Sequence, residues 1–290
     1  MKTNKSNAHA TGVFLVVISA AVFSTAGLFS KGLGAGAWDI IFWRGIFAAI
    51  LTTCYAWWRG SLHADFARMG GSGVAAALVQ ASGTAAFIPA FKLTSIANVS
   101  LIYAATPLLA AMLARLWIGE RMRGVVALGA IASLAGVGVI VFGSLGRINL
   151  RGDLLALCMA LAMAILFVIY RRHPNTPSAG PAVLSSLVLL PIALVFGTPF
   201  NDAAHEIAIM AVFGAVFALA SVTLAEGAKR LPAGETALLS NLEVALAPAL
   251  AWLAFSEIPI LATVAGGILV VLGVLVSQCK SKELQPTSGI

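Results

Sequence analysis

Apolar residues run through this chain in long, nearly uninterrupted segments separated by short polar breaks. Most segments hold about 20 residues, which in a helix is enough to cross the roughly 30 Å hydrocarbon core of a bilayer. The breaks carry Gly, Pro, Asn and charged residues, which favour turns, and none leaves room for a further domain. The pattern predicts an all-α integral membrane protein with ten transmembrane helices, at residues 12–30, 38–58, 72–91, 95–117, 124–143, 152–170, 181–197, 206–228, 232–256 and 260–278.

The two halves of the chain resemble each other when one is shifted along the other. A shift of 140 residues aligns Lys31 with Arg171, and a shift of 137 aligns Glu120 with Glu257. Each half holds five predicted spans, and because five is odd, the second half must enter the membrane from the opposite side. We therefore predict two inverted five-helix repeats, an arrangement in which the solute site lies near the midplane between them. The predicted parts are a tail at 1–11, repeats at 12–143 and 152–278, and a tail at 279–290.

Composition and charge fit this placement in a membrane. The chain is 60% hydrophobic and 10% charged, against roughly 45 to 50% and about 25% in soluble domains. The net charge of +7 comes from basic residues scattered between spans, which argues against nucleic acid as a partner. In the ten-span arrangement, twelve of the 18 Lys and Arg fall on one side and four on the other, with Arg44 and Arg115 inside spans. The positive-inside rule then places both termini in the cytoplasm.

The first 26 residues permit a second interpretation, a cleaved signal peptide. Lys2 and Lys5 precede an apolar stretch, and the Ser-Thr-Ala sequence that ends at Ala26 has small residues at the required positions. Cleavage would leave nine spans and would leave the corresponding span of the second half without a counterpart. We expect the first span to be retained.

Functions other than transport find little support in the sequence. The four histidines lie in the tail or loops, and there is no Gly-rich phosphate-binding loop for ATP. The three cysteines, Cys54, Cys158 and Cys279, lack the spacing of a disulfide or metal framework. We therefore expect no enzyme activity, no cofactor and no metal. A channel is a distant alternative, because channels usually use rings of repeated polar residues from symmetric subunits.

Each half ends with a span, a glutamate and a span punctuated by glycines. These elements are residues 107–120 followed by Gly129 and Gly136 in the first half, and residues 242–257 followed by Gly266 and Gly273 in the second. Together with the five-plus-five arrangement, they resemble the EamA type of the drug/metabolite transporter superfamily over nearly the whole chain. The second half departs from the usual Leu-Glu-Pro of that family, because Val244 holds the matching position and Pro248 comes four residues later.

The chain is also similar to the YddG-like bacterial exporters of aromatic amino acids. The resemblance implies a secondary transporter of a bacterial-type inner membrane that exports small metabolites, foremost neutral or aromatic amino acids, by alternating access. Its partners would then be the lipid bilayer and a small solute, while the oligomeric state stays open, with a monomer as one option. Efflux of amphipathic drugs or other metabolites is the alternative.

Polar and aromatic side chains at membrane depth are the candidates for solute binding, since such groups tend to face a cavity or a partner. In the third span Gln80, Thr84 and Phe87 recur at helical spacing, either lining a cavity or packing helices together. In the fourth span Pro107 leaves a backbone carbonyl without its helical partner, either for a cation or as a simple kink. The candidate binding residues are Gln80, Thr84, Phe87, Tyr103, Thr106, Met163, Phe217, Ser240 and Asn241, and the predicted helix breaks are Pro107 and Pro248.

Four ionisable residues are candidates for coupling or gating. Glu243 could carry a coupling proton or bind an ammonium, or it could lie neutral between helices. Arg44 could extend toward the outer interface or recognise a carboxylate. The other two, Glu226 and Glu235, flank a Lys-Arg pair and could form an ion-pair cluster or a gate.

Two further expectations concern residues near the ends of the repeats. Glu120 is expected to cap the next helix or to pair with Arg121 or Arg123. The small residues that include Gly129 and Gly273 permit close helix contact, which we expect between the last helices of the two repeats.

Overall fold

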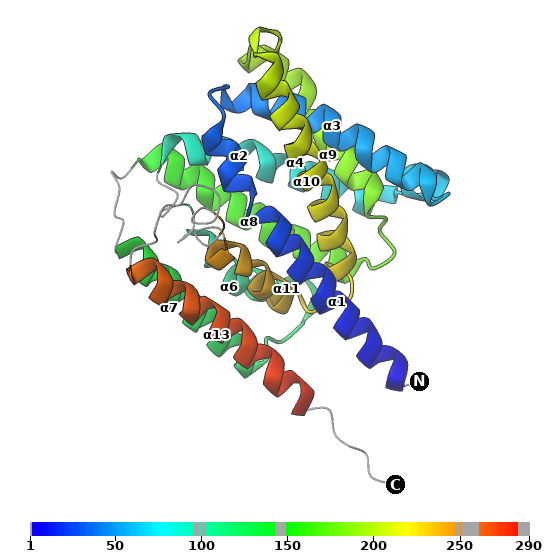
Figure 1. The fold of residues 1–290 in the computed structure, drawn as a ribbon. Coiled ribbons are helices and arrows are strands. Elements are labelled where there is room, and N and C mark those ends of the chain that lie inside the picture. Colours follow the sequence, from blue (N-terminus) through cyan, green and yellow to red (C-terminus); the bar gives the residue numbers. More distant parts are fainter. Residues whose placement is uncertain are drawn as a thin grey trace.

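The computed structural model describes residues 2–94, 99, 102–142, 149–246, 250 and 261–283. In this part of the chain the regular structure is entirely helical, with no strand (Figure 1). The helices with described bounds are α1 (Lys2–Phe23), α2 (Ala26–Gly32), α3 (Ala37–Trp58), α4 (Gly70–Leu93), α6 (Thr106–Ile118), α7 (Gly124–Phe142), α8 (Leu150–Arg172), α9 (Ala179–Phe196), α10 (Ala204–Ala228), α11 (Ala233–Ser240) and α13 (Leu261–Glu283), with the short π-helix η1 (His63–Ala67) and the short 3-10 helix η2 (Pro199–Asn201).

Six described segments are long and apolar enough to cross a bilayer. They are Asn7–Ser30, Ala37–Trp58, Gly70–Leu93, Leu150–Arg172, Ala179–Phe196 and Ala204–Ala228. Shorter apolar helices cover Thr106–Ile118, Gly124–Val139 and Val264–Val276. The all-helical, apolar character expected from the sequence is confirmed for the described residues, while the count of ten spans and the inverted repeat stay predictions.

The first span is broken where the sequence pattern indicated a continuous helix. The hydroxyl of Ser24 donates to the carbonyl of Ala21 at 2.6 Å, and that of Thr25 donates to Val22 at 2.7 Å. Such local bonds compete with the helical backbone bonds and favour an interruption. Helix also extends further than expected at both ends of the chain, since α1 begins at Lys2 and α13 ends at Glu283.

Helices from the two halves pack against one another in the main bundle. α3 lies against α9 and α10, α4 lies against α8, and α1 runs along α10. Buried alanines such as Ala76 and Ala164 allow this close packing around larger side chains, among them Phe167 and Tyr170. Large apolar side chains such as Leu116 point outward instead, as expected for helices solvated by lipid.

α7 and α13 form a closely packed antiparallel pair at one side of the bundle (Figure 1). A Cβ atom at Gly129 would lie 2.5 Å from the carbonyl oxygen of Gly273, and one at Gly136 would lie 2.6 Å from that of Gly266. The backbones therefore touch at two levels. This confirms the expected glycine contact between these two helices.

α3 carries tryptophan at both ends of its 22 residues. Near its start, Trp43 donates from Nε1 to the carbonyl of Pro199 at 2.8 Å. At its end, Trp57 and Trp58 are exposed. Trp is enriched where a helix leaves the hydrocarbon core, because its ring is apolar and its N–H is polar.

Three carboxylates gather at the end of the bundle where α3 begins. Asp39 accepts a hydrogen bond from the backbone N–H of Thr198 at 2.5 Å, and Glu206 accepts one from Gly34 at 2.9 Å. The Oδ2 atom of Asp202 is buried and has no hydrogen-bond partner among the described residues. Burial, together with the neighbouring Asp39 and Glu206, raises the pKa of Asp202 above its ordinary value of 3.8.

We expect Asp202→Asn to be more stable than the wild type near neutral pH, with a gap of about 2 °C in thermal midpoint. Because the folded state raises the pKa of Asp202, its carboxyl stabilises the fold below pH 3.8 and this contribution is lost as pH rises through the raised pKa. Thermal midpoints of both proteins are measured in detergent from pH 4 to 7. The difference between Asp202→Asn and the wild type should widen as the pH rises. Asp65→Asn is the control, since Asp65 already accepts from Ser61. Parallel curves for wild type and Asp202→Asn would contradict the prediction.

Candidate functional site

A partly open cavity of about 80 Å³ lies between helices of both halves of the chain. Its walls come from α1, α2, α3, α4, α8 and α10, and from side chains just before α6 and just after α11. Eight residues singled out in the sequence line it together: Arg44, Gln80, Thr84, Phe87, Tyr103, Met163, Phe217 and Glu243. The cavity is the place in the described part of the chain where these candidates converge.

α4 contributes one face of the cavity through residues spaced three and four apart. Gln80, Thr84 and Phe87 all line the wall, as their helical spacing indicated. Gln80 also donates from Nε2 to the hydroxyl of Ser221 on α10 at 3.1 Å. This bond links α4 to α10 at the cavity wall and fixes the orientation of the amide.

Arg44 lies on α3 with its side chain inside the bundle. The side chain is 3% exposed, and Cζ lies 4.0 Å from the ring centroid of Phe217 and 5.3 Å from that of Phe213. Its Nε has no hydrogen-bond partner among the described residues. The side chain therefore does not extend along the helix toward water, which was one of the two expectations. Its guanidinium borders the cavity instead.

Glu243 follows the end of α11 and lines the same cavity as Arg44. The side chain is half-buried. Among the described residues it forms no ion pair, with Arg44 or with any other cation. One basic and one acidic side chain thus reach the cavity from different halves of the chain without neutralising each other.

Asn241 and Ser240 do not line the cavity, contrary to the expectation for them. Asn241 is fully buried and donates from Nδ2 to the carbonyl of Ala104 and to the hydroxyl of Ser133, both at 3.2 Å. Ser240 donates to the carbonyl of Thr236 at 2.9 Å. Both side chains donate to buried acceptors within the bundle, while Oδ1 of Asn241 is buried without a hydrogen-bond partner among the described residues.

The predicted break at Pro107 is a helix start rather than a kink. α6 begins at Thr106, so Pro107 lies in the first turn, where its missing N–H costs no helical bond. The carbonyl that Pro107 leaves free belongs to Tyr103, and it accepts from the hydroxyl of Thr106 at 2.5 Å. Thr106 is fully buried and outside the cavity, and the freed carbonyl already has a donor. The other predicted break, Pro248, lies outside the described residues.

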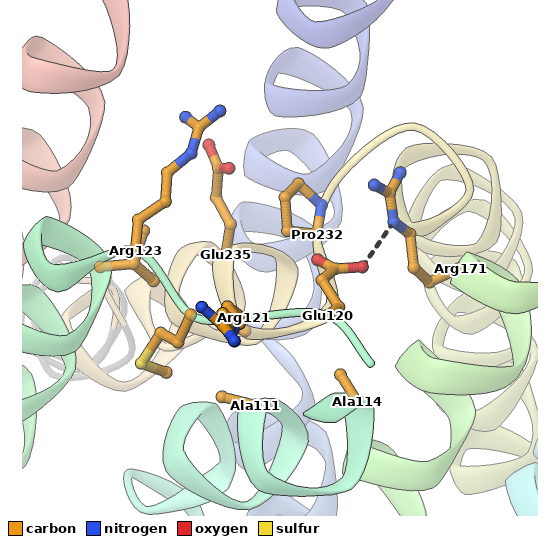
Figure 2. A pocket seen from close by; sticks show the side chains of 11 residues that line it. Ala111, Ala114, Glu120, Arg121, Arg123, Arg171, Pro232 and Glu235 are labelled. Carbon is orange, nitrogen blue, oxygen red and sulfur yellow. Dashed lines mark hydrogen bonds and ion pairs between the residues drawn. The ribbon is translucent and has the colours of Figure 1, made fainter. Parts of the chain in front are cut away.

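A second pocket, of about 220 Å³, lies where α6, α8 and α11 meet and is lined by charged groups (Figure 2). Arg171 at the end of α8 donates from Nε to Oε2 of Glu120 at 2.9 Å. Glu120 was expected to cap the next helix or to pair with Arg121 or Arg123, and this expectation was wrong. Gly119 adopts a left-handed conformation with φ of 69°, which ends α6 and turns the chain at Glu120.

Glu226 and Glu235 form separate contacts rather than one cluster. Glu226 pairs with Lys229 at 2.6 Å and with Arg230 at 2.8 Å, all within one turn of chain. Glu235 is 1% exposed and lies 3.0 Å from Nε2 of His9 on α1. The local ion-pair alternative therefore describes Glu226, while Glu235 joins α1 to α11 beside the second pocket.

Several residues of the cavity wall are not among the candidates expected from the sequence. Tyr170 lies at the end of a predicted span beside two arginines, a position that gives no sign of a cavity. Ser221 lies inside a span and could have been found by the rule applied to Gln80. Phe23 precedes the unexpected break in the first span. Among the described residues, no group of three or more His, Cys, Asp or Glu side chains is placed to hold a metal.

Known proteins resemble this chain at three levels. A model of the EamA-like transporter family matches residues 10–142 and 150–278. The uncharacterized transporter YdfC of Bacillus subtilis (strain 168) is 30% identical over 207 residues, which span 67% of this chain and 66% of that protein, just under two thirds of its length. A solved crystal structure of a protein superposes with a TM-score of 0.82 at 20% identity, covering 95% of this chain and 99% of that one, and shows the shared fold alone. The chain belongs to the EamA-like transporter family.

Proposed function

We propose that this protein is a secondary transporter that exports small metabolites, foremost neutral or aromatic amino acids, from a bacterial-type cell. The observation that carries the proposal is the cavity between the two halves, walled by rings and thioethers such as Phe87, Met163 and Phe217. Phosphorylated solutes would need several basic groups at this depth. Among the described lining residues Arg44 is the only cation.

The proposed architecture is ten transmembrane helices in two inverted repeats, 12–143 and 152–278, with both termini in the cytoplasm. The family model matches the chain twice, once in each half, which supports the repeat. α1 begins and α13 ends toward the same side of the bundle (Figure 1), which supports an even number of crossings. The likeness to YddG-like exporters of aromatic amino acids supports the direction and the solute class.

Polar contacts at both ends of the bundle support alternating access around the cavity. At one end, Glu120 pairs with Arg171, and His9 contacts Glu235. At the other end, Glu206 accepts from the backbone N–H of Gly34 at 2.9 Å, and Thr94 donates to Oδ1 of Asp153 at 2.8 Å. Opening either end would break one set of contacts while the other set holds.

The test is uptake of labelled neutral and aromatic amino acids into proteoliposomes, with and without a proton gradient. We expect saturable uptake that falls about threefold to tenfold in Gln80→Ala, because one hydrogen-bonding group at the wall is lost. Ser82→Ala is the matched control, since Ser82 is exposed on the same helix and bonds only to the carbonyl of Val79.

Three results of this assay have different meanings. Saturable amino-acid uptake that depends on Gln80 supports the proposal. Uptake of amphipathic amines without amino acids favours the alternative, drug or metabolite efflux, for which the aromatic walls are also suited. Uptake that is identical in Gln80→Ala and Ser82→Ala removes the cavity as the transport site.

A further inference from the structure

We propose that the cavity recognises both charged ends of a zwitterion, with Arg44 binding the carboxylate and Glu243 binding the ammonium of the solute. This inference rests on the proposed function, since it takes the cavity to be the transport site. It goes further by assigning the two charged groups opposite roles in one site. It also predicts which of the two candidate solute classes, amino acids or amines, the protein selects.

The requirement for a carboxylate comes from the surroundings of Arg44. A buried guanidinium without a partner is unfavourable, because it has lost water and gained no acceptor in return. Arg44 is 3% exposed, and its Nε has no acceptor among the described residues. The ring of Phe217, 4.0 Å from Cζ, offers the guanidinium a cation–π contact but no oxygen or nitrogen acceptor for its N–H groups. A carboxylate accepts such a planar fork in a bidentate manner.

The requirement for an ammonium comes from Glu243. Its side chain borders the same cavity, and no ion pair joins it to Arg44 or to another described cation. The two charged groups are supplied by different halves of the chain, one on α3 and one beyond α11. A solute that carries both charges can partner both groups at once. A solute with only one charge leaves the other group unpaired.

Charge balance in the wall favours the same solute. Among the described lining residues, Arg44 and Glu243 are the only acidic or basic side chains, so the wall is neutral overall when both carry charge. A bare cation would meet repulsion from Arg44, and a bare anion would meet repulsion from Glu243. The rings of Phe87, Phe213 and Phe217 then accommodate an apolar or aromatic side chain.

The experiment compares three probes with the same phenyl group and different charges: L-phenylalanine, phenethylamine and 3-phenylpropionate. Competition against labelled L-phenylalanine is measured on the full chain in detergent, and flux is measured in proteoliposomes. We expect the wild type to bind L-phenylalanine at least about 100-fold more tightly than either analogue, because each analogue leaves one buried charge unpaired. Arg59→Gln, at the exposed end of α3, is the control and should keep this order.

The variants should change which probe binds most tightly relative to the others, and not only the affinity for L-phenylalanine. In Arg44→Met, binding of L-phenylalanine should fall about 100-fold, while binding of phenethylamine should hold or rise. In Glu243→Gln, 3-phenylpropionate should gain relative to L-phenylalanine. Arg44→Lys, which keeps the charge and loses the planar fork, should fall between the wild type and Arg44→Met.

The result is the ratio of the affinities of one protein for two probes. This ratio does not depend on the fraction of the protein that folds. Equal losses for all three probes in either variant would overturn the assignment, because a general defect leaves the ratio unchanged. A wild type that transports phenethylamine as well as L-phenylalanine would also overturn it, while leaving the proposed transport function in place. No saturable flux of any solute would instead contradict the proposed function itself.

Discussion

Joining Glu120→Cys to Arg171→Cys with a bifunctional thiol reagent that contains a reducible disulfide is expected to stop transport completely, and reduction is expected to restore it. The two side chains meet at 2.9 Å and belong to different halves of the chain, since Glu120 follows α6 and Arg171 ends α8. If the halves rock around the cavity, this contact must open once in every cycle. Flux of a labelled solute into proteoliposomes, before and after reductant, measures the effect. The native cysteines, Cys54, Cys158 and Cys279, are first replaced by alanine.

A cross-link that joins residues of one turn is the control for this experiment. Glu226→Cys and Arg230→Cys occupy an i,i+4 pair at 2.8 Å, and their link constrains no relative motion of the halves. Transport should continue with this link in place. Continued transport through the Glu120 and Arg171 link would rule out opening at this end.

Gly129→Val is expected to lower the thermal midpoint in detergent by about 5 °C or more. A Cβ at this position would lie 2.5 Å from the carbonyl oxygen of Gly273, so α7 and α13 would have to move apart. Overpacking of this kind usually costs about 1 to 3 kcal/mol, and here the obstacle is backbone, which cannot rotate away.

Gly138→Val provides a control on the same helix, with the same change in helix propensity. A Cβ at Gly138 would meet nothing within 4 Å. Its midpoint should therefore stay within about 2 °C of the wild type. Equal losses in the two variants would mean that propensity, rather than the contact with α13, explains the effect.

The part of the site that could be predicted is the part that depends on helical geometry alone. α4 is a helix of 24 residues, so residues three and four apart stay on one face and Gln80, Thr84 and Phe87 reach the cavity together. The same geometry brings Met163 on α8 and Phe217 on α10 to the same wall. For these residues, hydrophobic depth and spacing were sufficient information.

The part that could not be predicted depends on which neighbour a polar group finds. A buried amide or hydroxyl can face a cavity or bond to a nearby carbonyl, and both solutions look alike in sequence. The side chains of Asn241 and Thr106 bond to nearby carbonyls. Glu120 had two arginines beside it in sequence and pairs with Arg171, 51 residues away. Partner choice at such distances is decided by packing, which the spacing of residues does not encode.

The tryptophans at the two ends of α3 also set a length that the surrounding lipid must match. The 22 residues of this helix measure about 33 Å at about 1.5 Å per residue, close to the thickness of an average bilayer core. In a thinner bilayer, the apolar ends of α3 would meet headgroups or the helix would tilt, and each ångström of mismatch carries a small free-energy cost. α3 also holds Arg44 at the cavity wall, so a change in its tilt would move this guanidinium relative to α10. Acyl-chain length is thereby linked to the shape of the cavity through a single helix.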